Sequence, residues 1–234
     1  MNLSDINLDE FIAIDVETTG LDLFNDKIIE ISAIKFKNSQ IIDIFTKLIN
    51  PKQKIPSFIE NLTGITNQNI VDAPIFNEIS NELMNFVDKM PIVGHNVKFD
   101  IDFINKEFDG LFDLYDSRMI CDTYQLSKIF LYDHHSFKLE SLCNYFKINL
   151  EVAHRAEDDA KNTGYLFLEI LEIIIQHSLN HFNNLYKVYS ENMIINKELF
   201  FNLINCCLKQ SIISINPQDK LSSSKFVYNN KIKE

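Results

Sequence analysis

Three short apolar runs follow one another at the start of the chain. They occupy residues 10–17, 27–36 and 41–49, and the turn-forming pair Asn38-Ser39 separates the second run from the third. Successive β-runs joined this tightly predict strands that pair antiparallel. The start of the chain therefore predicts a fold built around a β-sheet.

After these runs the apolar residues recur with a helical period. Pro74 stands where the first turn of a helix tolerates proline, and apolar residues follow it at three- or four-residue steps. They are Ile75, Ile79, Leu83 and Phe86. A helix is therefore predicted at this place.

Two further strands alternate with the remaining helices. Short apolar runs predict strands at 91–94 and at a segment that ends at Asp122. Antiparallel strands followed by strands that alternate with helices are typical of an α/β fold with a mixed sheet flanked by helices. The helices expected after these strands include one with Phe99, Phe103 and Ile104, two at about 123–130 and 138–147, and a long one from about 155.

The length of 234 residues suits one globular domain of ordinary size with an appendage. We expect the domain at residues 1–177 and a helical extension with a polar tail at residues 178–234. Two amphipathic helices are predicted near 180–190 and 197–209. The sequence after them is dominated by Ser, Asn and Lys and is expected to be mobile.

The ends of the chain and its hydropathy indicate a cytoplasmic protein. The N-terminus is polar and acidic, unlike a signal peptide, and no apolar run approaches the roughly 20 residues needed to cross a bilayer. The chain runs from an initiating Met to a polar end, which favours a complete protein. The cysteines form no CxxC pair, so we expect thiols in a reducing compartment rather than a zinc site or disulfides: Cys121, Cys143, Cys206 and Cys207.

The formal net charge of −11 bears on nucleic-acid binding. Proteins that hold duplexes by their phosphates usually carry a basic surface. Extensive non-specific duplex binding is therefore not expected. An enzyme that grips only a short terminal stretch, with cations bridging its carboxylates to phosphate, is compatible with this charge.

Two acids stand at the end of the first apolar run. Asp15 and Glu17 are two residues apart, so on a strand they project from the same face. Such a pair repels and is costly to desolvate unless something neutralises it, and a divalent cation with a preference for oxygen ligands would do so. Solvated acids at a strand end are an equally weighted alternative.

A third acid, Asp100, comes at the start of a predicted helix. The helix dipole alone would favour an acid there. The dipole does not explain the preceding Gly94-His95-Asn96, which suits a close, polar approach by a ligand. Asp100 is therefore a further candidate for the same site.

The sequence AHRAEDDA holds the last group of candidates. His154 and Asp158 have the i,i+4 spacing of ligands on one helix face, whereas His154 and Asp159 would lie on different faces. We expect His154 in the loop and Asp159 in the first turns of the helix, so that both reach one cleft. A surface histidine beside acids is the simpler alternative.

Together these residues suit chemistry at phosphorus. Three or four carboxylates can hold two cations roughly 3.5–4 Å apart, which stabilises the attacking and leaving oxygens of an in-line displacement. The nucleophile is then a water, and a histidine, whose pKa lies near working pH, suits the role of its base. The pattern therefore favours metal-dependent cleavage of phosphodiesters.

Six blocks appear in order over about residues 10–170: IDVETTG, IIEISA, LTGIT, GHNVKFD, CDT and HRAEDDA. This order resembles that of the DEDDh 3′→5′ exonucleases, the superfamily of the proofreading subunit of bacterial replicative DNA polymerase. The resemblance implies an RNase H-like fold with a central mixed five-stranded sheet, and exonuclease activity with two Mg²⁺ or Mn²⁺ ions. It also implies metal ligands at Asp15, Glu17, Asp100 and Asp159 and a general base at His154.

The resemblance further implies contacts with the 3′-terminal nucleotide. Thr18 would contact it through its backbone or hydroxyl, Leu62 and Gly64 would lie against the terminal base, and Asn96 would help to shape the pocket. Thr63 departs from the pattern, because proofreading subunits often have histidine at this position. In this respect LTGIT is similar to exonuclease domains attached to Gram-positive-type polymerases and to helicase-like proteins.

The extension offers a weaker lead to partners. In some proofreading subunits the segment after the catalytic domain binds the polymerase, and a Gln-led hexapeptide binds the sliding clamp. By resemblance, residues 178–215 would bind a DNA polymerase subunit or a clamp. The hexapeptide from Gln210 to Ile215 has the glutamine and the aliphatic residues but no terminal aromatic, so the end of an apolar helix is the favoured interpretation.

The leading hypothesis is a DNA exonuclease of proofreading or repair that acts on a single-stranded or frayed 3′ end. An RNA or oligoribonucleotide exonuclease shares the chemistry and would differ in its contacts with the 2′-hydroxyl. A non-catalytic module that binds a partner would be expected to have lost one or more of the acids. A piece of a larger polymerase or helicase is the fourth alternative.

Overall fold

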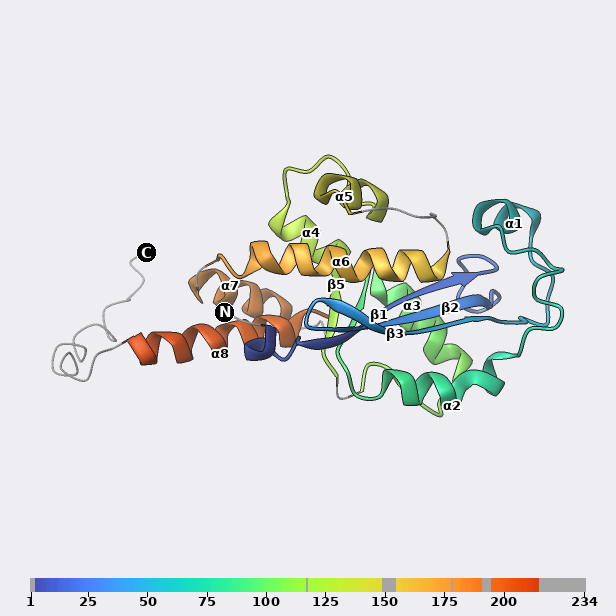
Figure 1. Ribbon diagram of the computed structural model, residues 1–234, viewed down its shortest axis with the longest axis horizontal. Helices are drawn as coiled ribbons and strands as arrows, with labels where there is room; N and C mark the ends of the chain where they lie inside the picture. Colours follow the sequence, from blue (N-terminus) through green and yellow to red (C-terminus); the bar gives the residue numbers. More distant parts are fainter. Residues whose placement is uncertain (1–2, 117, 149–154, 178, 191–194, 215–234) are drawn as a thin grey trace.

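A computed structural model of the protein describes residues 3–116, 118–148, 155–177, 179–190 and 195–214. At its centre is a five-stranded sheet with the order β3-β2-β1-β4-β5 (Figure 1). β1, β2 and β3 pair antiparallel, whereas β4 runs parallel to β1 and β5 parallel to β4. The mixed sheet predicted from the sequence is therefore confirmed. The strands are β1 (Glu10–Thr18), β2 (Ile28–Lys37), β3 (Gln40–Leu48), β4 (Ile92–Gly94) and β5 (Ile120–Asp122).

Helices cover both faces of this sheet. In Figure 1, α4, α5 and α6 lie on one side of the sheet, and α2 and α3 lie on the other. The helices are α1 (Ser57–Thr63), α2 (Phe76–Val87), α3 (Val97–Glu107), α4 (Thr123–Phe130), α5 (Leu139–Phe146), α6 (Ala156–Ile174), α7 (Leu179–Ser190) and α8 (Lys197–Ser214), with a short 3₁₀ helix, η1 (Leu3–Ile6), before β1.

Alternate residues of β1 enter two different cores. Phe11 and Ala13 belong to the core on the α6 side, whereas Ile12 belongs to the core shared with α2 and α3. Successive side chains of a strand point to opposite faces, so Asp15 and Glu17 continue the row of Phe11 and Ala13. The alternation of the strand thus places both acids on the face that α6 covers.

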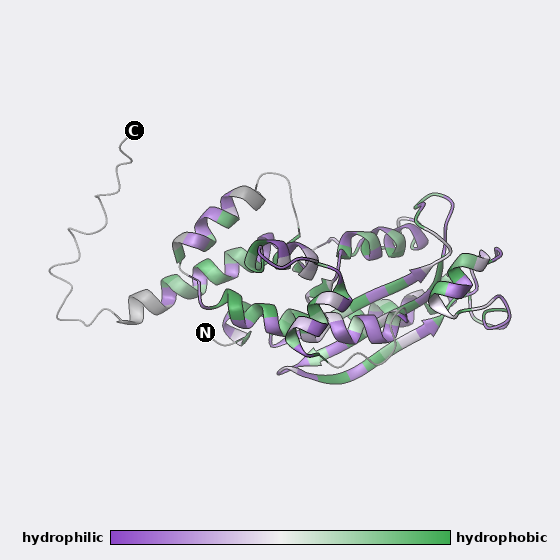
Figure 2. Cartoon of the chain, turned by 90° about the horizontal axis from the view of Figure 1, so that it is seen from above, coloured by the Kyte–Doolittle hydropathy of each residue, from purple (hydrophilic) through white to green (hydrophobic). Residues whose placement is uncertain are grey.

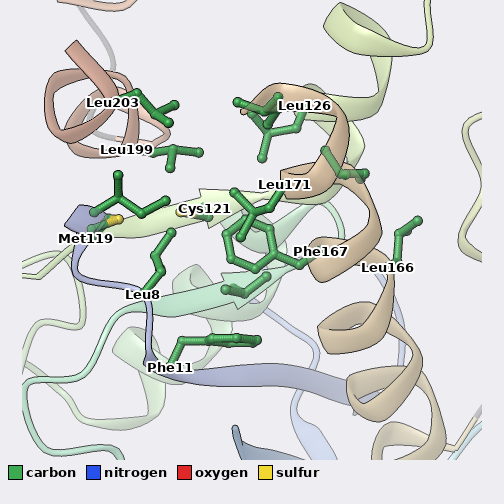
Figure 3. Packing of buried hydrophobic residues seen from close by; sticks show 14 of the residues in the cluster. Leu8, Phe11, Met119, Cys121, Leu126, Leu166, Phe167, Leu171, Leu199 and Leu203 are labelled. Atoms are coloured by element: carbon green, nitrogen blue, oxygen red, sulfur yellow. The ribbon is translucent and has the colours of Figure 1, made fainter. Parts of the chain in front are cut away.

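Helix α6 lies close against the sheet at Gly164. A Cβ atom at this position would sit 2.2 Å from Cε2 of Phe36 on β2, so glycine is needed for an approach this close. The ring of Phe36 stacks on Phe11 with 4.9 Å between the centroids, and Phe167 of α6 meets Phe11 edge-on (Figure 3). This packing fixes the rotation of α6 and hence the direction in which its first turn presents its side chains.

The C-terminal helices pack on the same core as α6. Leu199 and Leu203 of α8 are fully buried, and they share one hydrophobic cluster with Leu8 and with Leu126 of α4 (Figure 3). The helices expected near 180–190 and 197–209 are present as α7 and α8. The division of the chain at residue 177 into a domain and an extension stays a prediction.

The hexapeptide from Gln210 to Ile215 and the polar tail lie at the end of the extension. The first residues of the Gln-led hexapeptide, 210–214, continue α8, and Ile215 lies outside the described residues. The polar tail also lies outside them. Over the described ranges, no helix is both long and apolar enough to cross a membrane, and Figure 2 shows hydrophilic residues interrupting the hydrophobic ones along the helices.

Candidate active site

Three carboxylates meet where β1 ends and α6 begins. One oxygen atom each from Asp15, Glu17 and Asp159 lies within 4.8 Å of the other two, and the three residues are partly buried. Asp15 and Glu17 project from the same face of β1, and Asp159 stands in the first turn of α6. Oxygen atoms at this separation can bind the same divalent cation.

Asp100 joins this group from the first turn of α3. It is only 4% exposed, and its Oδ1 accepts a hydrogen bond from the backbone N–H of Val16 at 3.1 Å. Val16 lies between Asp15 and Glu17 in β1, so this hydrogen bond holds Asp100 next to the strand that carries both acids. The structure thus brings together the four acids that the resemblance singles out as metal ligands.

Their common burial changes the pKa values of these acids. Burial above all, and then the neighbouring Asp100, raises the pKa of Asp15 well above its ordinary value. Burial, followed by the charges of Asp159 and Glu30, raises the pKa of Glu17 to about 7. The charged forms are therefore costly in the metal-free protein, and a divalent cation would remove this cost. A donor set made only of carboxylate oxygens fits Mg²⁺ or Mn²⁺.

A fifth carboxylate, that of Glu30 on β2, lies directly opposite Glu17 in the strand pair and is fully buried. It accepts hydrogen bonds from Nε and Nη2 of Arg155 at 3.1 and 2.6 Å, and from the backbone N–H of Ala156 at 3.0 Å. Ala156 is the first residue of α6, so these bonds tie the start of that helix to the sheet. The only sequence signal for Glu30 is an acid inside the otherwise apolar run IIEIS.

The turn before α3 is held from inside the protein. The ring nitrogens of His95 bond to Oγ1 of Thr123 and to the carbonyl oxygen of Phe137, each at 2.9 Å. Burial lowers the pKa of His95 to about 4, so its ring is neutral near pH 7. Asn96 follows with a left-handed backbone (φ 66°) and is exposed. Of these two polar residues, Asn96 is the one that a ligand can reach.

The LTGIT segment ends the short helix α1. The hydroxyl of Thr63 donates to the carbonyl of Ile59 and accepts from the backbone N–H of Ile65, and the residue is buried. Thr63 therefore stabilises the end of the helix, and it does not extend into solvent as a longer polar side chain could. Gly64 takes the left-handed conformation (φ 72°), and Leu62 is 51% exposed, so its apolar side chain is accessible.

Thr18 and His154 complete the set of predicted site residues. Thr18 is buried directly after Glu17, where the pairing of β1 with β2 shifts register, and its hydroxyl donates to the carbonyl of Gly20. The hydroxyl of Thr18 is thus engaged in a hydrogen bond within the turn. His154 lies outside the described residues and immediately precedes Arg155 in the sequence.

Comparison with known proteins gives one family and several relatives. The model of the RNase_T family, described as an exonuclease family, matches residues 12–167. A PolC-type DNA polymerase III from Caldanaerobacter subterraneus subsp. tengcongensis is 36% identical over 190 residues, which cover 81% of this chain and 14% of the relative. The 3′-5′ exonuclease DinG of Bacillus subtilis is 40% identical over 173 residues, which cover 73% of this chain and 18% of the relative. The chain thus spans less than a fifth of the length of these relatives.

Solved structures share the fold at lower identity. Exonuclease X in complex with 5′ overhanging duplex DNA is 21% identical with a TM-score of 0.57, and the match covers 69% of this chain and 91% of that one. E. coli Exonuclease I in complex with a dT13 oligonucleotide is 19% identical with a TM-score of 0.61, over 77% and 44% of the two chains. The nuclease domain of 3′hExo, a DEDDh family member bound to rAMP, is 19% identical with a TM-score of 0.60, over 70% and 92%. The RNase H-like α/β fold expected from the sequence is therefore confirmed.

Proposed function

Because the chain belongs to the RNase_T exonuclease family, we propose that it removes nucleotides one at a time from the 3′ end of DNA. The observation that carries this proposal is the cluster of Asp15, Glu17 and Asp159, with Asp100 next to it. Buried carboxylates that repel one another are unfavourable in a structure that gains nothing from them. A cation site that works on phosphodiesters accounts for their arrangement.

Asp15, Glu17, Asp100 and Asp159 would hold two divalent cations, Mg²⁺ or Mn²⁺, in this proposal. Such ions supply charge stabilisation to the attacking and leaving oxygens of an in-line displacement at phosphorus. The acids come from β1, α3 and the first turn of α6, which are rigid elements. Ligands on rigid elements keep their geometry during the reaction and need no reorganisation in the transition state.

His154 is the proposed general base, which takes a proton from the attacking water. A neutral imidazole near pH 7 can accept this proton. The residue after it, Arg155, is bound to the buried Glu30, which anchors the chain at the start of α6. This anchor keeps Arg155, the residue next to His154 in the sequence, beside the acids of the site, which supports the proposed role of His154.

The 3′-terminal nucleotide would lie against Thr18, Leu62, Gly64 and Asn96. Leu62 offers an accessible apolar side chain to the terminal base, and Gly64 leaves room for close approach because it lacks a Cβ atom. Asn96 is exposed at the start of α3, four residues before Asp100. Substrate contact by Thr18 would use its backbone, because its hydroxyl already donates within the turn.

DNA is favoured over RNA by the names of the relatives, a PolC-type DNA polymerase III and the 3′-5′ exonuclease DinG. Proofreading or repair is the proposed setting, in which the chain acts on a single-stranded or frayed 3′ end. A polymerase subunit is the proposed partner, because the matched region is part of a far longer polymerase in the PolC-type relative. The second candidate is an RNA exonuclease of the same chemistry, and the 3′hExo nuclease domain with bound rAMP has this fold too.

The test uses matched single-stranded DNA and RNA oligonucleotides of one sequence, labelled at the 5′ end or the 3′ end. Each is incubated with the protein and Mg²⁺ or Mn²⁺, with EDTA and the Asp15→Ala variant as controls. We expect 5′-labelled DNA to give a metal-dependent ladder of shortening products, and 3′-labelled DNA to release labelled mononucleotide at once.

The ratio of the DNA and RNA rates separates the two candidates. Faster cleavage of RNA would replace the first with the second. A folded protein that cleaves neither oligonucleotide with either metal would refute the proposed activity. It would favour the alternative of a non-catalytic module that binds a partner.

A further inference from the structure

The segment before α8 forms the outer neighbour of β5, the last strand of the sheet. The backbone N–H of Asn196 donates to the carbonyl of Ile120 at 2.7 Å, and its side-chain Oδ1 accepts from the backbone N–H of Asp122 at 2.8 Å. These two groups of β5 point away from β4, the neighbour on its other side. One residue of the C-terminal extension thus pairs with both of these backbone groups at the outer edge of the sheet.

Asparagine suits this position for two reasons. Asn196 has a left-handed backbone (φ 62°), a conformation that few residues other than glycine adopt as readily as asparagine. Its side-chain amide carries an acceptor for Asp122 and a donor, Nδ2, that reaches Oε1 of Gln125 at 3.4 Å. Its own carbonyl accepts from the N–H of Phe200, so the same residue also starts α8. Asn196 is fully buried.

Asp122, whose backbone N–H binds Asn196, also connects two other elements through its side chain. Its Oδ1 accepts hydrogen bonds from the N–H of Asn96 at 3.0 Å and of Tyr124 at 2.9 Å, so it joins the turn before α3 to the start of α4. Its Oδ2 is buried and has no hydrogen-bond partner among the described residues. A buried oxygen without a partner costs free energy, so the placement of Asp122 depends on the hydrogen bonds of its Oδ1 and its backbone.

From Asp122 the chain of contacts reaches the carboxylate cluster. Asn96 starts α3, whose first turn carries Asp100, and Asp100 accepts a hydrogen bond from Val16 between Asp15 and Glu17. A displacement of β5 at Asp122 would therefore move the N–H of Asn96, the first turn of α3, and the carboxylate of Asp100 in turn.

We propose that Asn196 is a positioning residue of the active site: by fixing Asp122 at the edge of the sheet, it keeps Asn96 and the start of α3 in place so that Asp100 stays beside Asp15. The C-terminal extension is then part of the support of the metal site as well as a helical appendage. This inference rests on the proposed function, because it assumes that the carboxylate cluster binds cations.

The extension offers a matched control. Asn202, on α8, donates a hydrogen bond from Nδ2 to the carbonyl of Ile6 at 3.1 Å. This bond anchors α8 to η1, and none of its atoms belongs to the route through Asp122. Asn196→Gly removes the side-chain bonds to Asp122 and Gln125 and permits the left-handed backbone. Asn202→Ala removes a side-chain bond of similar kind within α8, the helix that follows Asn196.

The experiment compares Mn²⁺ affinity, kcat, KM and thermal midpoint for the full-length wild type and both variants. We expect Asn196→Gly to weaken Mn²⁺ binding and to lower kcat, each by about tenfold, the lower end of what residues behind metal ligands contribute, with KM for the oligonucleotide little changed. Asn202→Ala should lower only the thermal midpoint. Equal Mn²⁺ affinity and kcat in the two variants would overturn the inference.

A second measurement needs no variant. Coupling between two sites is reciprocal, so Mn²⁺ binding should slow hydrogen exchange at the amides of Asp122 and Asn196. Unchanged exchange at both amides, when Mn²⁺ is bound, would overturn the inference even if Asn196→Gly failed to fold. A wild-type protein that neither binds Mn²⁺ nor cleaves DNA would instead refute the proposed function, and this inference with it.

Discussion

Arg155 donates two hydrogen bonds to the carboxylate of Glu30, which is buried directly opposite Glu17. Like charges opposite each other in a strand pair are destabilising, and without a compensating charge Glu30 would weaken the pairing between the end of β1 and the start of β2. The guanidinium compensates this charge, and the N–H of Ala156 adds a third hydrogen bond. The ion pair between Arg155 and Glu30 thus compensates the charge of an acid next to the cluster. It also anchors the start of α6, the helix that carries Asp159.

Replacing Arg155 by alanine should destabilise the protein. Removing one partner of a buried ion pair costs about 3–5 kcal/mol, but the side chain of Arg155 is 44% exposed, so water screens the pair and we expect a loss of about 2 kcal/mol. Urea denaturation measures the change. Lys161→Ala is the control, because Lys161 pairs with Glu157 within one helix and should contribute roughly 0.5 kcal/mol or less. An Arg155→Ala effect as small as the control would show that Glu30 needs no guanidinium.

Asp15→Ala should abolish cleavage and leave the metal-free protein intact or slightly more stable. The variant removes an acid whose pKa is raised by burial and by Asp100, so we expect the metal-free protein to lose no stability and to gain slightly. Cleavage assays and thermal unfolding in EDTA check the two parts. An Asp15→Ala enzyme with full activity would refute the site.

Asp100→Ala provides an informative contrast. It should also abolish cleavage, but it leaves the buried N–H of Val16 without its acceptor, which costs about 1–3 kcal/mol. Its stability should therefore fall below that of Asp15→Ala. Asp100→Asn retains an oxygen acceptor and should recover most of the difference in the same thermal assay.

The stability of the metal-free protein should decrease between about pH 5 and pH 8. The pKa of Glu17 is about 7 in the folded protein, so over this range the folded state keeps a proton that the unfolded chain has released. The free energy of unfolding then falls as pH rises, by roughly 3 kcal/mol at most for this group, and Asp15 acts in the same direction. Thermal midpoints in EDTA at several pH values measure the trend.

Two further conditions test the cause of this pH dependence. Mn²⁺ at pH 8 should restore the lost stability, because the cation binds the charged carboxylates of the folded protein. Glu17→Gln should reduce the slope in EDTA. A metal-free protein that is more stable at pH 8 than at pH 5.5 would contradict the raised pKa values.

His154→Ala should separate catalysis from metal binding. A general base contributes about 10²–10⁴-fold to rate, so kcat should fall by this factor while Mn²⁺ affinity changes little. Calorimetric Mn²⁺ titration together with single-turnover cleavage makes the comparison. A parallel loss of affinity and rate would make His154 a metal ligand.

Long elements with regular patterns were predictable from sequence. The apolar run of β1 led to a strand that the structure buries on both faces, and the three- and four-residue spacing led to α2, which buries one face. That face includes the predicted Ile79 and Leu83, whereas Ile75 is the N-cap of the helix. Helix α1 was not foreseen, since only Ile59 and Thr63 of its seven residues are buried and it presents no stripe. The fold class followed from the order of the elements.

The site was predictable only in part, for a physical reason. Asp15 and Glu17 stand two apart on a strand, so local geometry alone places them together. The contacts of Glu30 with Arg155 and of Asn196 with Asp122 join residues far apart in the chain, and no spacing rule connects them. In the sequence Asn196 is one polar residue in an Asn-rich extension, and only the folded sheet edge gives it a role.

The acids of the site also come from distant parts of the chain, Asp15 and Glu17 from β1 and Asp159 from α6. Contacts between distant residues form late, because the intervening chain must lose entropy before they stabilise it. During synthesis β1 leaves the ribosome well before α6 exists. The proposed exonuclease therefore cannot act until α6 has been made and has packed against β1, so the order of synthesis delays its activity without a separate inhibitor.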